Sequence, residues 1–164
     1  MEVTPERMTN WILMAAMAGA TTIAAVSTVG AHQTPAPAGT PPASAAPGRS
    51  TWDGVYTDAQ AERGQQLYTT HCASCHRESL EGEGPATPLS GPGFLANWNG
   101  LTMGAMVERT RTTMPFNQPG TLSRQQVADV LAFVLRANKF PAGQTELPRQ
   151  SDALEQIKFV AARP

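Results

Sequence analysis

Apolar residues recur at helical spacing in three stretches between residues 52 and 141, and the last stretch is the clearest. Ser123 followed by Gln126 has the pattern of a capping box at a helix start. The apolar positions that follow lie on one helix face: Val127, Val130, Leu131, Val134 and Leu135. The pattern predicts a helix that begins after Ser123 and ends near Asn138, with Pro141 just beyond.

A first helix is predicted to begin after Thr57 and to run toward Cys72. Ala61, Gly64 and Tyr68 fall on one face of this helix. A glycine inside a helix costs about 1 kcal/mol relative to alanine. A close crossing with another helix would account for Gly64.

A second helix is predicted after Thr102, ending near Thr113, and its apolar positions are Met103, Met106 and Val107. Residues 81–100, between the first two helices, are rich in Gly and Pro and are expected to form an irregular loop. So long a loop is unusual in a small domain, and a core of about 90 residues is thin. Both observations indicate a large buried group. No segment alternates enough to predict a strand, so the expected fold is all-α.

The N-terminal residues have the pattern of an export signal. The stretch from Trp11 to Ala31 is weakly apolar, and small or medium residues precede a possible cleavage site before His32. The amino end is atypical, because Glu2 and Glu6 outweigh the positive charge of Arg7. Residues 1–31 are therefore expected to be a signal peptide, with an uncleaved membrane anchor as the alternative. Either outcome places the rest of the chain outside the cytoplasm.

Three further segments are expected after residue 31. Residues 32–51 consist almost entirely of Ala, Pro, Gly, Ser and Thr, which predicts a disordered linker. Residues 52–147 form the predicted folded domain, and residues 148–164 form a C-terminal tail. Within the tail, residues 152–159 have the pattern of a short helix that either packs on the domain or contacts a partner. The formal net charge of −1 gives no basic surface for nucleic acid.

The two cysteines of the chain, Cys72 and Cys75, are followed directly by His76. This Cys-x-x-Cys-His string is the attachment signal for c-type haem. On a helical turn both sulfurs can reach the two vinyl groups of haem, and His76 can bind the iron from the same turn. A thioredoxin-like site would need a βαβ context, and zinc would need further Cys or His ligands. A disulfide across two residues would be strained. We therefore expect one covalently bound haem c.

The methionines are the main candidates for a second axial ligand of the iron. Met103 and Met106 lie at helical spacing and are most simply core residues. Met114 follows the second helix, and Pro115 disfavours helix at Met114 itself. His32 and His71 are poorly placed, one in the linker and one beside Cys72. Met114 is thus the predicted ligand opposite His76, with Met103 or Met106 as alternatives.

These features resemble the class I c-type cytochromes. The likeness covers residues 52–147 and is carried by the haem string, Met114-Pro115, and the flanking helices with Gly64 and Tyr68 facing Leu131 and Phe133. Residues 94–100, 119–123 and 140–143 are similar, more narrowly, to the monohaem cytochrome c domains associated with bacterial quinoprotein dehydrogenases.

The resemblance implies a small helical domain wrapped around the haem, with its first and last helices crossing. It also implies that a loop proline, Pro85 or Pro88, offers the carbonyl that orients His76. By the same resemblance, Trp98 is expected to pack on the haem or to bond a propionate, with a core tryptophan under the loop as the alternative. The sequence does not decide which proline orients His76 or which of the two roles Trp98 has.

The function expected is electron transport rather than enzyme catalysis. His76 and Met114 would together close the iron to substrates, so the protein would carry single electrons in the periplasm. A dehydrogenase would be the donor, and an oxidase or membrane complex the acceptor. Two alternatives remain: a haem that binds small ligands or peroxide if Met114 is weakly bound, and a subunit of a dehydrogenase complex.

Overall fold

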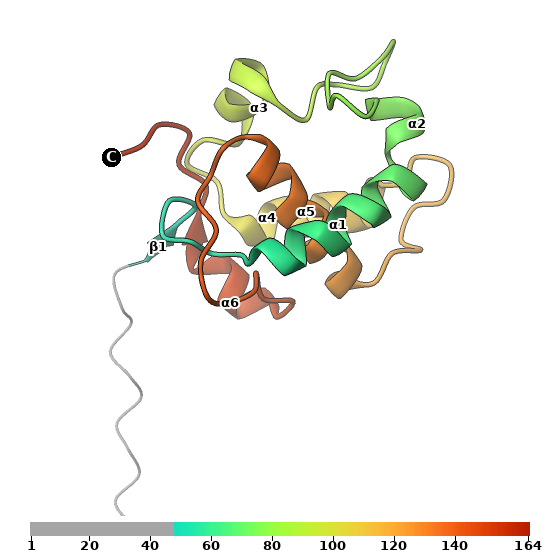
Figure 1. Ribbon diagram of the computed structural model, residues 1–164. Helices are drawn as coiled ribbons and strands as arrows, with labels where there is room; N and C mark the ends of the chain where they lie inside the picture. The colour runs from blue at the N-terminus through green and yellow to red at the C-terminus, as the bar shows by residue number, and fades with distance from the viewer. Residues whose placement is uncertain (1–47) are drawn as a thin grey trace, which may run out of the picture. The chain divides into compact units, whose positions relative to one another are not determined.

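The computed structural model describes residues 48–164 (Figure 1). In chain order the elements are β1 Arg49–Ser50, α1 Asp58–His71, α2 Ala73–His76, α3 Gly91–Trp98, α4 Met103–Thr113, α5 Arg124–Ala137, α6 Ser151–Glu155 and β2 Ile157–Lys158. The predicted signal peptide and most of the predicted linker lie outside the described residues. Within residues 48–164, no helix has the length and apolar character needed to span a bilayer.

The three predicted helices are confirmed as α1, α4 and α5, which begin directly after Thr57, Thr102 and Ser123 as predicted. The hydroxyls of Thr57 and Thr102 accept hydrogen bonds from the third residue beyond each cap. At the start of α5, Ser123 and Gln126 form both bonds of a capping box. The predicted apolar face of α5 is buried throughout. Local sequence therefore defines where these three helices begin and which face each one buries.

Helices α1 and α5 cross at Gly64. A Cβ atom at this position would lie 1.8 Å from the backbone oxygen of Asp129 in α5. Only glycine allows two helix backbones to approach so closely. The crossing predicted from Gly64 is therefore present.

Buried polar side chains join the two crossing helices. Gln60 of α1 is fully buried and donates to the carboxylate of Asp129 (3.1 Å) and to the Leu147 carbonyl (3.0 Å). The Leu147 amide donates back to Gln60 (2.7 Å). Arg63 adds an ion pair with Asp129 at 3.3 Å. Every buried polar atom here has a partner, so the network specifies the crossing without leaving an unpaired group.

The prediction of an entirely irregular loop over residues 81–100 is wrong. Its last part forms α3, which carries a proline in its first turn and buries Phe94. Proline is well tolerated there because its missing amide would be unpaired anyway. The apolar residues of α3 are too few to show helical periodicity, and packing of Phe94 edge-to-face on Phe159 (5.9 Å between ring centres) supplies the missing stabilisation.

The C-terminal tail packs on the domain, which is the first of the two roles that the sequence left open for it. Leu154, Ile157 and Phe159 are each at most 1% exposed. The helix is shorter than predicted, because α6 ends at Glu155 and the chain then becomes extended.

The expectation that the domain has no strand is wrong as well. Strands β1 and β2 pair in parallel, with Arg49 opposite Ile157 and Ser50 opposite Lys158. Two-residue strands are too short to show alternation in a sequence. Residues 49–51, assigned to the linker, are part of the ordered domain, and Thr51 is fully buried.

We predict that Gly64→Ala destabilises the protein by about 3 kcal/mol, because the new methyl group meets the rigid backbone of α5. Gly104→Ala is the matched control: this buried helical glycine faces only the flexible end of Glu155. The control should change stability by no more than about 1 kcal/mol. Denaturant unfolding followed by circular dichroism measures both, and equal losses would contradict the close crossing.

Replacing Phe159 by alanine should cost about 3–5 kcal/mol, because its ring is fully buried against Phe94 and Phe140. Its exposed neighbour Lys158 provides the control, and Lys158→Ala should stay within about 0.5 kcal/mol of the parent. The same unfolding experiment compares the two. A Phe159→Ala protein as stable as the control would mean that the tail is dispensable.

Candidate functional site

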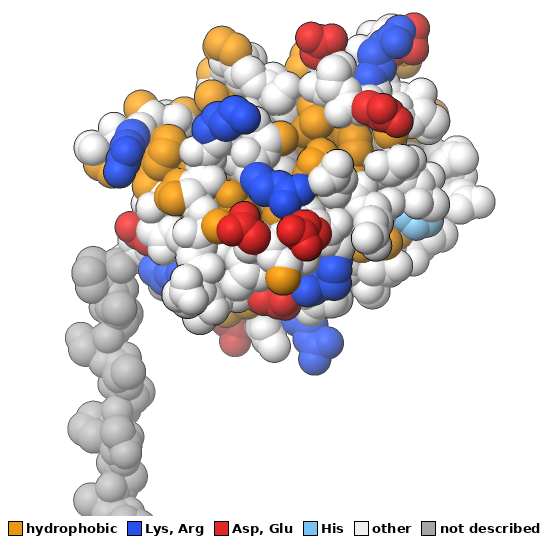
Figure 2. All heavy atoms as spheres, viewed as in Figure 1, with side chains coloured by type: hydrophobic (Ala, Val, Ile, Leu, Met, Phe, Trp, Pro, Cys, Tyr) orange, Lys and Arg blue, Asp and Glu red, His pale blue; other side chains and the backbone are white. Residues whose placement is uncertain are grey.

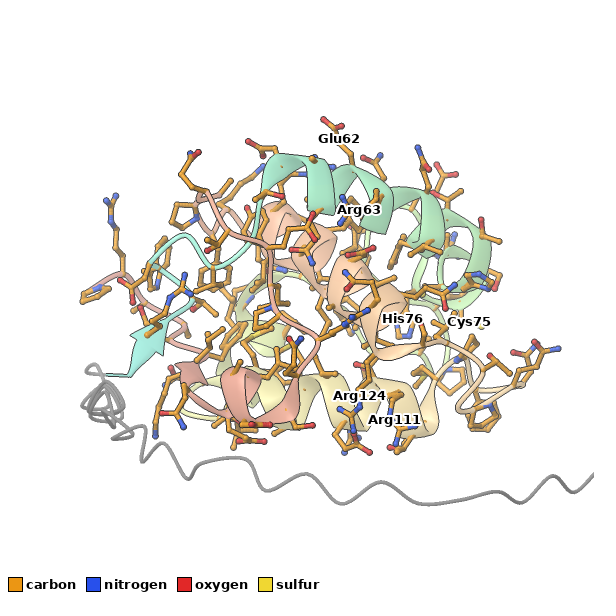
Figure 3. All side chains as sticks on the ribbon, turned by 90° about the horizontal axis from the view of Figure 1, so that it is seen from below. Glu62, Arg63, Cys75, His76, Arg111 and Arg124 are labelled. Atoms are coloured by element: carbon orange, nitrogen blue, oxygen red, sulfur yellow. The ribbon has the colours of Figure 1, made fainter. Side chains whose placement is uncertain are left out.

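The two cysteines and His76 lie on one short turn at the end of α1. Cys72 ends α1 and accepts hydrogen bonds from the amides of Cys75 (3.2 Å) and His76 (2.9 Å). Both thiols are free; Cys72 is half-buried and Cys75 is exposed. Burial, with a smaller contribution from Cys75, raises the pKa of the Cys72 thiol to about 11. Figure 3 shows Cys75 and His76 together at one end of the domain.

The His76 side chain is buried, with only 8% of its surface exposed. Its Nδ1 atom lies 2.9 Å from the carbonyl oxygen of Thr87, to which it can donate. This hydrogen bond fixes the orientation of the ring and leaves Nε2 as the atom able to bind a metal ion.

The prediction that the carbonyl of Pro85 or Pro88 orients His76 is wrong. The acceptor belongs to Thr87, the residue directly before Pro88. The path of the loop decides this, because the Leu89 amide donates to the Leu80 carbonyl (2.8 Å) and the Gly82 amide to the His76 carbonyl (3.0 Å). These bonds join residues far enough apart along the loop that no local pattern reveals them.

Tyr68 supports the same turn, which sequence reasoning missed. Its buried hydroxyl donates to the carbonyl of Arg77, the residue after His76, at 2.6 Å. Burial raises the pKa of Tyr68 to about 12, so the hydroxyl keeps its proton at neutral pH. The signal available in the sequence was a hydroxylated aromatic residue one helical turn before Cys72.

Met114 is the residue that ends α4. Its backbone is extended (φ −125°, ψ 151°) and its side chain is half-buried. Met103 and Met106, in contrast, are 0% and 1% exposed and belong to the core. Among the methionines of residues 48–164, Met114 is thus the one outside the packed core.

Several apolar side chains that pack against the core are only partly buried. They come from the turn after α1, the loop beyond α2, and α3, and they include Cys72, Ala73, Leu89, Leu95 and Trp98. Figure 2 shows apolar side chains on the surface between α3 and α2. Trp98 packs on the core, as one of its two predicted roles requires.

These donors suit a haem better than a bare metal ion. Within the described part of the chain, no group of three or more His, Cys, Asp and Glu side chains could hold a metal ion. Two thiols on one turn, an imidazole with its second nitrogen already hydrogen-bonded, and a partly exposed apolar surface fit a covalently attached macrocycle.

Comparison with known proteins agrees with this chemistry. Residues 61–138 match the family model described as Cytochrome c. A search of curated proteins and a search of solved structures gave no significant match. The matched residues run from α1 to the end of α5 and include the haem string. The chain therefore carries a cytochrome c domain, an all-α fold whose cofactor is a covalently bound haem c with its iron.

Proposed function

We propose that this chain is an exported carrier of single electrons, with haem attached through Cys72 and Cys75 and with His76 and Met114 as the axial ligands. A cytochrome c domain supports electron transfer between redox proteins rather than enzyme catalysis. The haem iron supplies the one-electron couple between its ferrous and ferric states. The axial ligands of the iron, the export of the chain and the identity of its redox partners are proposals.

The observation that carries the proposal is the hydrogen bond between His76 Nδ1 and the Thr87 carbonyl, 2.9 Å long. Histidine ligands of metals almost always donate their second ring N–H to a carbonyl or carboxylate. His76 has this partner and is buried, as a ligand of a haem iron would be.

Met114 is proposed as the second ligand because it follows α4 in an extended segment, outside the packed core. A thioether ligand raises the reduction potential relative to a second histidine. Two bound ligands also leave the iron closed to substrates, which suits electron transfer.

Arginine side chains near Met114 are poorly arranged for peroxide chemistry, which disfavours the catalytic alternative. Arg111 forms an ion pair with Glu108 (2.7 Å), and Arg124 forms another with the same carboxylate group (3.0 Å). Figure 3 shows Arg111 and Arg124 close together. Arg109 is exposed. These arginines are therefore surface charges already engaged or solvated.

The proposed site of action is the periplasm, because residues 1–31 have the pattern of an export signal or anchor. A periplasmic dehydrogenase is the proposed donor and an oxidase or membrane complex the proposed acceptor. The face seen in Figure 2 carries both acidic and basic side chains, interspersed. Docking on this face would depend only weakly on salt, since no field of one sign dominates it.

Met114→Ala should abolish the weak sulfur-to-iron charge-transfer band at the red edge of the visible spectrum of the oxidised protein. The physical reason is loss of the thioether ligand. Met106→Leu serves as control, because Met106 is buried in the core and its replacement should leave the band in place. Absence of the band from the unaltered protein, or its survival in Met114→Ala, would refute the ligand assignment.

Replacing Cys72 and Cys75 together by alanine should give a haem-free protein that is largely unfolded, because the core of so small a domain depends on its cofactor. Far-ultraviolet circular dichroism and the absorbance of denatured protein report helix content and covalent haem. Ser74→Ala, on the same turn, should keep both. A stable, helical, haem-free double variant would show that the polypeptide core suffices alone.

A further inference from the structure

We propose that Gly82 is a positioning residue that holds the Thr87 carbonyl against His76 and thereby keeps the reduction potential of the haem low. The inference rests on the proposed function, because it takes His76 as an iron ligand. Gly82 would act through its backbone contacts with His76 and with the Ala86–Thr87 segment, since a glycine has no side chain to bind the haem.

Gly82 lies between the two ends of the loop that follows α2. Its amide donates to the His76 carbonyl at 3.0 Å, so one side of Gly82 is attached to the histidine backbone. Its other side faces the peptide that joins Ala86 to Thr87. Gly82 thus connects the histidine to the segment that carries the acceptor carbonyl.

Space at Gly82 is too small for any side chain. A Cβ atom there would lie 2.1 Å from the backbone oxygen of Ala86 and 2.9 Å from the carbonyl carbon of Thr87. The atoms that it meets are backbone atoms, which cannot rotate away as a side chain can. The Ala86–Thr87 segment would have to move, and the Thr87 carbonyl belongs to that segment.

Displacement of this carbonyl would act on the iron through His76. The carbonyl accepts the Nδ1–H bond at 2.9 Å and increases the basicity of the imidazole. A more basic ligand stabilises ferric over ferrous iron and lowers the reduction potential. A longer or lost hydrogen bond therefore raises the potential.

Gly84 offers a matched control in the same loop. Both glycines have a positive φ, +74° at Gly82 and +56° at Gly84, so alanine is strained at either position. A Cβ atom at Gly84 has no atom within 4 Å. The two alanine variants share the backbone strain and differ in the contact with the Thr87 segment.

The experiment compares Gly82→Ala and Gly84→Ala in the haem-loaded, full-length protein. Spectroelectrochemical titration measures the reduction potential, and proton NMR of the reduced protein follows hydrogen exchange of the His76 Nδ1–H. Gly82→Ala should raise the potential and accelerate this exchange, whereas Gly84→Ala should match the parent in both. Equal values in the two variants, whether shifted or unshifted, would overturn the role of Gly82.

A second variant covers the case in which Gly82→Ala does not yield haem-loaded protein. Ala86→Gly frees the backbone beside the Thr87 carbonyl without adding an atom. It should also raise the reduction potential, by a smaller amount than Gly82→Ala. An unchanged potential would overturn the inference.

The ligand assignment is tested separately in the same NMR spectra. Absence of haem-shifted ring protons of His76 from the unaltered protein would refute His76 as a ligand, and with it the proposed function. Presence of those signals with equal potentials in the two glycine variants would refute only the role of Gly82.

Discussion

The crossing of α1 and α5 at Gly64 is the constraint on which the rest of the domain depends. Because the two backbones touch there, the buried polar network of Gln60 and Asp129 can form across the helices. The same contact holds α1 in position against α5, and Cys72 and the following turn lie directly at the end of α1. A helix pair held by a backbone contact and by paired polar groups has one preferred arrangement, since a slide in either direction would leave buried donors without acceptors. The turn with Cys72, Cys75 and His76 thus follows directly from one of the two crossing helices.

The end of α1 and the loop after α2 together position His76. The Tyr68 hydroxyl donates a hydrogen bond to the Arg77 carbonyl, and the Thr87 carbonyl accepts one from the imidazole of His76. The histidine is therefore positioned by one group from the helix before it and one from the loop after it. This arrangement allows a mostly irregular segment to orient an imidazole accurately, because its own backbone groups supply the hydrogen bonds.

The C-terminal segment solves a different problem, which is the small size of the core. Its apolar residues lie against α4 and α3, and the Phe159 backbone bonds both Gly100 (2.8 Å) and Leu101 (2.8 Å), which follow α3. Trp52 at the start of the domain donates its indole N–H to the Val160 carbonyl (2.9 Å). The tail thereby joins the first residues of the domain to the end of α3. Burial of these apolar residues adds to a core that the matched cytochrome c region alone would leave thin.

Local sequence by itself determined the limits of α1, α4 and α5, because caps and helical periodicity act within a few residues. It also determined the haem string, since the spacing of Cys72, Cys75 and His76 is set by a single turn. Tertiary structure alone decided that α3 is a helix, that β1 pairs with β2, and that Thr87 rather than a proline orients His76. Each of these depends on contacts between residues distant in the chain, such as Phe94 with Phe159. Gly64 lies between the two cases: its residue type indicated a close crossing, and only the fold showed that the partner atom is the backbone oxygen of Asp129.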